Sequence, residues 1–141
     1  MKILAVDYGD ARTGLAICDK GEMLASPLGV IHQKNAGKLL VEVVEAVKQS
    51  RAELLVVGHP INMNGTLGER AELCSEFAAK LEEASGVHTV LWDERSTTVT
   101  ATQYLNMTDT RGKKRKDVVD AVAATIILES YLSYRRNNPE A

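Results

Sequence analysis

Two acidic positions directly follow apolar runs that are typical of buried strands. Asp7 comes after residues 3–6, and Glu94, with Asp93 beside it, comes after residues 88–92. Because ligands of a sheet with parallel strands usually collect beyond the carboxyl ends of those strands, carboxylates at these positions could face a shared ligand. Each position also has a purely structural interpretation, since Asp7 could begin a turn and Asp93 could cap the next helix.

A third acidic residue, Asp120, lies within a segment whose pattern predicts a buried helix. Residues 118–128 are apolar almost all round a helix. An unpaired carboxylate there would cost several kcal/mol or would take up a proton, so Asp120 needs a metal ion, a cation or hydrogen-bond donors. A buried pair with an arginine is the alternative. Asp117, one turn earlier, could be a further metal ligand or could cap the helix.

The chemistry that three carboxylates can perform together is metal-dependent phosphoryl transfer. Asp7, Glu94 and Asp120 supply hard oxygen ligands without a grouping of His or Cys, and such ligands suit Mg²⁺ or Mn²⁺ better than zinc. Two such ions can activate a water molecule and stabilise the leaving oxygen of an in-line displacement. The sequence therefore predicts catalytic and metal-binding roles for these three residues.

A basic segment, residues 107–116, precedes the predicted helix that carries Asp120 and is interpreted as a polar loop. It could be only a solvated loop, but its position beside the acidic residues favours phosphate binding, which is electrostatic and not specific for bases. Arg12 and Arg95 are further candidates to hold a phosphate. The predicted substrate-binding residues of the segment are Lys113, Lys114, Arg115 and Lys116.

The elements that must position these residues are visible in the hydrophobic periodicity. Three strands open the chain, and Pro27 favours an edge position for the third because proline cannot donate to a ladder. Helices and buried strands then alternate, which is the pattern of an α/β fold with a mixed five-stranded sheet flanked by helices. The predicted strands are residues 3–6, 14–18, 23–31, 54–58 and 88–92. The predicted helices begin at residues 35, 68, 96 and 117; Ser85 and Gly86 end the second, and the last ends at residue 134.

Length and composition limit the class of protein. With 141 residues and no linker or internal repeat, the chain is predicted to form one domain, residues 1–141, with a flexible tail at 136–141. A net charge of −2 excludes a uniformly basic nucleic-acid coat, so a polyanion site must be local. The absence of a signal peptide and of a run of about 18 apolar residues predicts a cytoplasmic protein without a membrane partner. Cys18 and Cys74 are assigned packing roles.

Four ordered motifs resemble those of the YqgF/RuvX family and together span nearly the whole chain. They occupy residues 6–16, 56–66, 92–98 and 120–124 with 126–132. The resemblance implies a single RNase H-like domain, places the family's acidic residues on Asp7, Glu94 and Asp120, and implies a nuclease that matures the 5′ end of precursor 16S ribosomal RNA. It also explains an older provisional label of Holliday junction resolvase. His59 stands where the family more often has leucine, and it is interpreted as a loop residue near the site.

Other functions stay open on sequence alone. Residues 7–9 with 13–14 also resemble the first phosphate loop of actin-like ATPases and sugar kinases, but those proteins close two such domains over a nucleotide and this chain supplies one. A DNA resolvase acting on branched junctions, or a non-catalytic RNA-binding module of ribosome assembly, would keep the same fold. We favour RNA processing by a monomer or weak homodimer, with precursor ribosomal RNA and ribosomal particles as partners, because symmetric cutting of a junction is simplest for a stable dimer.

Overall fold

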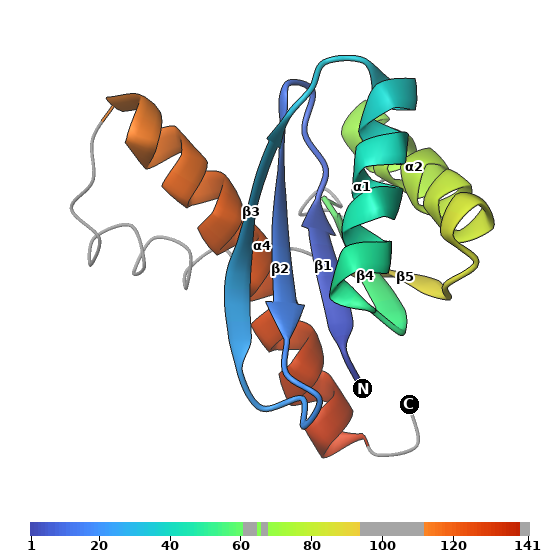
Figure 1. Ribbon diagram of the computed structural model, residues 1–141, viewed down its shortest axis with the longest axis vertical. Helices are drawn as coiled ribbons and strands as arrows, with labels where there is room; N and C mark the ends of the chain where they lie inside the picture. The colour runs from blue at the N-terminus through green and yellow to red at the C-terminus, as the bar shows by residue number, and fades with distance from the viewer. Residues whose placement is uncertain (61–64, 66–67, 94–111, 139–141) are drawn as a thin grey trace.

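A mixed sheet of five strands carries helices on both of its faces (Figure 1). The computed structural model describes residues 1–60, 65, 68–93 and 112–138, and it describes the side chains of these residues except for 112–120. The predicted α/β class with a mixed five-stranded sheet is confirmed. Along the chain the elements are β1 (Ile3–Asp7), β2 (Arg12–Cys18), β3 (Ala25–His32), α1 (Ala36–Ser50), β4 (Leu54–His59), α2 (Glu69–Ser85), β5 (Thr89–Asp93) and α4 (Gly112–Asn137).

The strands are arranged in the order β3-β2-β1-β4-β5. β1 pairs antiparallel with β2, with Asp7 opposite Gly14, and β2 pairs antiparallel with β3. Pro27 thus lies on an edge strand, as predicted. β4 runs parallel to β1, and β5 runs parallel to β4. The carboxyl ends of β1, β4 and β5 therefore lie at the same end of the sheet.

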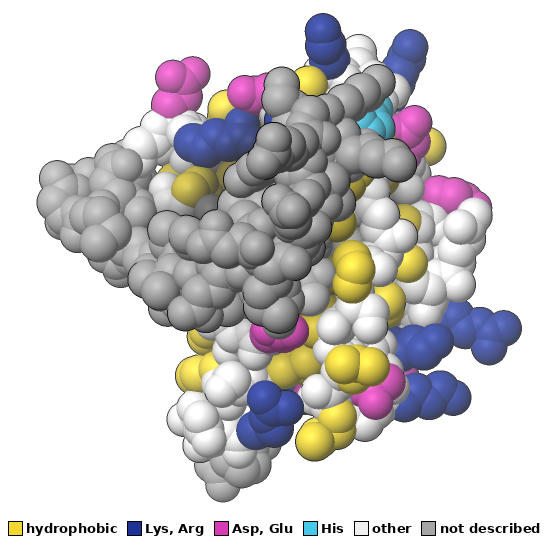
Figure 2. Space-filling view, turned by 90° about the vertical axis from the view of Figure 1, so that its left-hand side faces the viewer, with side chains coloured by type: hydrophobic (Ala, Val, Ile, Leu, Met, Phe, Trp, Pro, Cys, Tyr) yellow, Lys and Arg dark blue, Asp and Glu magenta, His cyan; other side chains and the backbone are white. Residues whose placement is uncertain are grey.

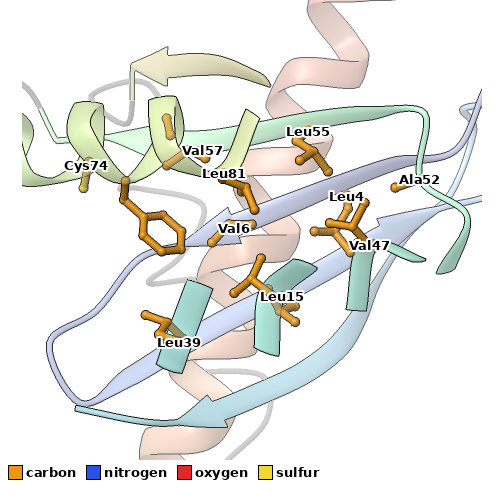
Figure 3. Close-up of a cluster of buried hydrophobic side chains, with 13 residues drawn as sticks. Leu4, Val6, Leu15, Leu39, Val47, Ala52, Leu55, Val57, Cys74 and Leu81 are labelled. Carbon is orange, nitrogen blue, oxygen red and sulfur yellow. The ribbon is translucent and has the colours of Figure 1, made fainter. Parts of the chain in front are cut away.

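Alternation of side chains along the strands divides the apolar residues between two cores. Leu4 and Val6 of β1 pack with residues of α1 and α2 in one core (Figure 3). Ile3 and Ala5 of the same strand pack with residues of α4 in the other. Complete burial of a side chain such as Ile3 or Leu4 stabilises the fold by about 1.5–3 kcal/mol. Whether a position in β1 is odd or even therefore decides which helical layer it faces.

Local signals set the ends of the two shorter helices. The side-chain oxygen of Asn35 accepts a hydrogen bond from the backbone N–H of Lys38 at 2.9 Å, which caps the start of α1. α2 ends at Gly86, which adopts the left-handed conformation with φ of 72°. Both features agree with the predicted helices. Cys18 and Cys74 are not joined in a disulfide and are buried in different cores, which agrees with their packing roles.

The last helix begins earlier than the sequence predicts. α4 starts at Gly112, so the interpretation of residues 112–116 as loop was wrong, and the helix continues to Asn137 within the predicted tail. Basic residues at a helix start oppose the helix dipole, but Lys and Arg are good helix formers and continue the turns of the helix that follows. The predicted helix at 96–105 lies outside the described residues. Within the described part of the chain, no helix is long and apolar enough to cross a membrane.

An ion pair fastens the turn between β2 and β3 to the end of α4. Arg135 donates from Nε to Oε1 of Glu22 at 2.6 Å and from Nη2 to Oε2 at 3.3 Å. The two side chains are only 20% and 22% exposed. The guanidinium of Arg135 therefore holds the pKa of Glu22 below its ordinary value.

Glu22→Gln is expected to lower the free energy of unfolding by about 0.5–1 kcal/mol near pH 7. Because the pKa of Glu22 is lower in the folded than in the unfolded chain, the contribution is present above the unfolded pKa of about 4.3 and is lost as the pH falls through the folded pKa. Urea unfolding of the wild type and the variant, near pH 7 and at a pH below the folded pKa of Glu22, measures the difference in free energy of unfolding. Glu83→Gln, on the exposed surface of α2, is the matched control, and an equal loss in both variants would contradict the prediction.

Candidate active site

Three strands end side by side at one end of the sheet. In the pairing of β4 with β5, Gly58 lies opposite Trp92 and His59 opposite Asp93. β1 pairs with β4 up to Val6 opposite Val57, and Asp7 is the next residue of β1. The carboxyl ends of these strands thus meet as the sequence predicts.

Side chains alternate between the two faces of the sheet along β1, and this places Asp7 on the face covered by α4. Ile3 and Ala5 belong to the core under α4, and Asp7 follows in the same series. The Asp7 side chain is half-buried. Figure 1 shows that α4 begins at the end of the sheet toward which β1 runs. Asp7 therefore lies at the strand end and on the sheet face that the predicted carboxylate site requires.

His59 belongs to the opposite layer. It ends β4, so its interpretation as a loop residue was wrong, because its backbone pairs with Asp93 and extends the strand. It lies two residues after Val57 of the α1/α2 core and therefore on the same face of the sheet. Its Nε2 lies 3.2 Å from Oγ of Ser75 in α2. Asp93 follows Trp92, which packs against the α4-side core, so Asp93 falls on the α2 side as well. His59 thus faces away from Asp7.

The structure leaves the remaining predicted ligands and basic residues largely undescribed. Glu94 and Arg95 lie outside the described residues. Asp117 and Asp120 lie in α4, but their side chains are not among those described. The same holds for the four basic residues of the predicted substrate-binding segment, Lys113, Lys114, Arg115 and Lys116. Asp7 and Arg12 are therefore the predicted site residues whose surroundings the structure shows.

A cleft of about 390 Å³ opens beside Asp7. It lies between the β1–β2 turn and the start of α2, and this volume is near the lower end of the about 300–1,000 Å³ found in ligand sites. Arg12, the first residue of β2, lines the cleft. Among the described residues, its lining is Asp7, Tyr8, Gly9, Asp10, Ala11, Arg12, Pro60, Arg70 and Cys74.

The turn that carries Asp7 into Arg12 depends on Gly9. Its backbone N–H donates to Oγ1 of Thr13 at 3.2 Å. A Cβ atom at this position would lie 1.8 Å from the backbone carbonyl oxygen of Arg12, which is far inside van der Waals contact. The turn therefore accepts only glycine without a shift of its backbone.

Gly9→Ala is expected to displace Arg12 and to reduce the phosphodiester cleavage predicted from the sequence by about 10-fold or more, because small misplacements of site residues can cost about 100-fold in rate. Single-turnover cleavage measures the effect. Gly21→Ala is the matched control, since a Cβ there meets no atom closer than 3.7 Å. Equal activity of the Gly9→Ala variant and the wild type would contradict this account of the turn.

Arg70 holds this turn against α2, and sequence reasoning missed it. Its Nη1 donates to Oδ1 of Asp10 at 2.7 Å, and its Nη2 donates to the backbone carbonyl of Tyr8. The guanidinium also lies 5.3 Å from the centroid of the Tyr8 ring, which stacks on Phe77. One local signal exists, because a cation in the first turn opposes the helix dipole and so suggests a tertiary partner.

Aromatic contacts tie the end of β5 to α4. Nε1 of Trp92 donates to Oγ of Ser130 at 3.0 Å. The Trp92 ring centroid lies 5.3 Å from that of Tyr131 and 5.2 Å from that of Tyr134. These contacts fix α4 relative to the strand that precedes Glu94 in the sequence.

Charges of both signs are interspersed with apolar side chains on the α4 side of the molecule (Figure 2). This distribution agrees with the net charge of −2. Attraction of a polyanion must therefore come from a local group of basic residues and not from the field of the whole protein.

The fold belongs to the RNase H-like class. The RuvC protein of Thermus thermophilus, solved in complex with a Holliday junction substrate, aligns with a TM-score of 0.62 at 15% identity, over 96% of each chain. The fowlpox virus resolvase, solved with Holliday junction DNA, aligns with a TM-score of 0.62 at 10% identity, over 95% of this chain and 98% of that chain. These likenesses confirm the predicted RNase H-like fold.

The sequence model of the RuvX family, described as Holliday junction resolvase, matches residues 1–134. A protein of Carboxydothermus hydrogenoformans, named provisionally as a pre-16S rRNA nuclease, is 41% identical over 138 residues, which cover 98% of this chain and 100% of the relative. The chain belongs to the RuvX family. The predicted family and the predicted enzyme class, a hydrolase of phosphodiester bonds, are thereby confirmed.

Proposed function

We propose that this protein is a metal-dependent nuclease that cleaves RNA and matures the 5′ end of precursor 16S ribosomal RNA. The observation that carries the proposal is the position of Asp7, half-buried at the carboxyl end of β1 on the face covered by α4. The full-length similarity to a relative named provisionally as a pre-16S rRNA nuclease supports the choice of substrate.

The donor set fits a divalent cation. In the sequence, Asp120 lies four residues, or one helical turn, before Ala124, which is buried in the core between α4 and the sheet. Val90 and Trp92 both pack on that core, and Glu94 is two residues after Trp92 in the sequence.

We propose that Asp7, Glu94 and Asp120 hold Mg²⁺ or Mn²⁺, with Asp117 as a further ligand, and that two ions bind. Bound ions of this kind would activate water and stabilise the leaving oxygen. The protein's own basic residues position the substrate. Arg12 lines the cleft beside Asp7, where a guanidinium can donate two hydrogen bonds to one phosphate. Arg95 and the segment that contains Lys113, Lys114, Arg115 and Lys116 are proposed to contact the flanking phosphates, with electrostatic attraction in place of base recognition.

The second candidate is a Holliday junction resolvase, which the description of the matching family favours. A resolvase cuts two strands symmetrically and is best served by a stable dimer, whereas trimming an RNA end needs one site. We propose a cytoplasmic monomer or weak homodimer that meets its RNA on ribosomal particles. A non-catalytic RNA-binding module is the remaining alternative.

Cleavage assays separate these functions. The purified protein is incubated with labelled 16S precursor RNA and with a labelled four-way DNA junction, in Mg²⁺, in Mn²⁺ and in chelator. We expect metal-dependent cleavage of the RNA near the mature 5′ end, and 16S RNA with extended 5′ ends when the protein is depleted in its host. Paired symmetric nicks in the junction, with normal 16S ends on depletion, would establish the resolvase instead. RNA binding without cleavage under any condition would establish the binding module.

A further inference from the structure

Arg70 occupies a position where it can serve the cleft as well as the turn. It lines the same cleft as Asp7 and Arg12, although it comes from α2 on the other side of that cleft. Its side chain is 37% exposed. An arginine has five N–H donors in a planar fork that matches the oxygens of a phosphate, and Arg70 uses two of its nitrogens in the bonds to Asp10 and Tyr8.

The two partners of Arg70 differ in how firmly they hold it. The Asp10 carboxylate is 84% exposed, and an exposed ion pair of this kind contributes about 0–1 kcal/mol. An incoming anion could therefore replace Asp10 at little cost. The backbone carbonyl and the ring of Tyr8 hold the guanidinium independently of Asp10, and the ring is itself stacked on Phe77 at 4.6 Å. Arg70 would thus stay in place when Asp10 leaves.

We propose that Arg70 binds a backbone phosphate of the nucleic acid in this cleft, and that Asp10 occupies Arg70 as an anionic place-holder in the free protein. The proposal rests on the proposed function for the kind of ligand, a nucleic-acid strand whose phosphate lies between Arg12 and Arg70 beside Asp7. Binding then exchanges one ion pair of Arg70 for another and removes the carboxylate of Asp10 from the path of the strand.

The two partners of one ion pair should therefore have opposite effects on binding. Arg70→Gln is expected to weaken binding of a fluorescein-labelled 16S precursor leader RNA about 5- to 8-fold near 0.1 M salt, and to reduce the salt slope by about 0.7–0.9, the value of one phosphate contact. Asp10→Asn is expected to tighten binding about 2- to 5-fold at the same salt. Arg70→Lys keeps the charge and should preserve most of the slope. Anisotropy titrations in chelator measure binding without cleavage.

A matched control separates the place-holder from a general charge effect. Glu72→Gln removes the same charge from an exposed residue in the first turn of α2. In the wild-type background, we expect Asp10→Asn to tighten binding more than Glu72→Gln does. In the Arg70→Gln background, we expect the two changes to tighten binding equally. Thermal unfolding of every variant shows whether losses of binding follow losses of stability.

Several outcomes would overturn the proposal. One is a salt slope that is unchanged in both Arg70→Gln and Arg70→Lys. Another is weaker binding by Asp10→Asn than by the wild type. A third is a loss of binding in Arg70→Gln and in Asp10→Asn that is proportional to the fall in melting temperature of each variant, which is what a purely structural ion pair would give. Absence of salt-dependent binding by the wild type would overturn it too. If binding follows the expected pattern but the wild type cleaves no RNA in metal, the proposed nuclease function fails and the phosphate contact stands.

Discussion

Asp7→Asn, Glu94→Gln and Asp120→Asn are each expected to reduce metal-dependent RNA cleavage more than about 100-fold while the fold stays intact. Changing a residue that merely orients a metal ligand already lowers metal affinity or activity by about 10- to 100-fold, so changing a ligand should lower activity more. Each change also removes a negative charge from a group that repels itself without metal. The metal-free variants should consequently be as stable as the wild type or more stable, most of all for Asp120→Asn.

Single-turnover cleavage across a titration of Mg²⁺ and Mn²⁺ measures this effect, and circular dichroism checks the fold. Asp93→Asn is the matched control, because Asp93 ends β5 beside Glu94 in the sequence and falls on the α2 side of the sheet. Its activity should remain within about 10-fold of the wild type, below the loss typical of a lost ligand. Full activity in any two of the three ligand variants, with unchanged metal dependence, would overturn the assignment.

Replacing Lys113, Lys114, Arg115 and Lys116 together with Ala is expected to weaken RNA binding and to flatten its salt dependence. If all four contact phosphates, the salt slope falls by about 0.7 per contact on single strands and about 0.9 on duplex, which near 0.15 M salt corresponds to losses of about 200-fold and about 1,000-fold. Turnover at saturating RNA should change less. The helix should persist, because these residues lie at the start of α4 and alanine is the best helix former.

The control for this variant removes the same charge elsewhere. Four exposed lysines, Lys34, Lys38, Lys48 and Lys80, are replaced with Ala. A local phosphate contact predicts a much smaller change in salt slope for the control, whereas a general effect of net charge predicts equal changes. Equal slopes for the wild type and the variant at residues 113–116 would show that this basic segment is only a solvated surface.

The sequence alone determined most of the secondary structure, because the signals for it are local. The apolar run before Asp7 predicts β1, Pro27 predicts an edge strand, and the glycine at residue 86 predicts the end of α2; the structure agrees with each. The start of α4 is the exception. Good helix formers and an unfavourable dipole oppose each other there, and local rules do not say which prevails.

Only the tertiary structure decided which side chains share a layer and a cleft. The alternation of side chains along β1, β4 and β5 puts Asp7 on one face of the sheet and His59 and Asp93 on the other. This alternation has meaning only when the partner strands and the covering helices are known. The contact between Arg70 and Asp10 joins positions 60 residues apart in the chain. Such a contact leaves almost no trace in either local sequence, because it arises from the packing of α2 against the sheet and not from the conformational preferences of the residues that make it.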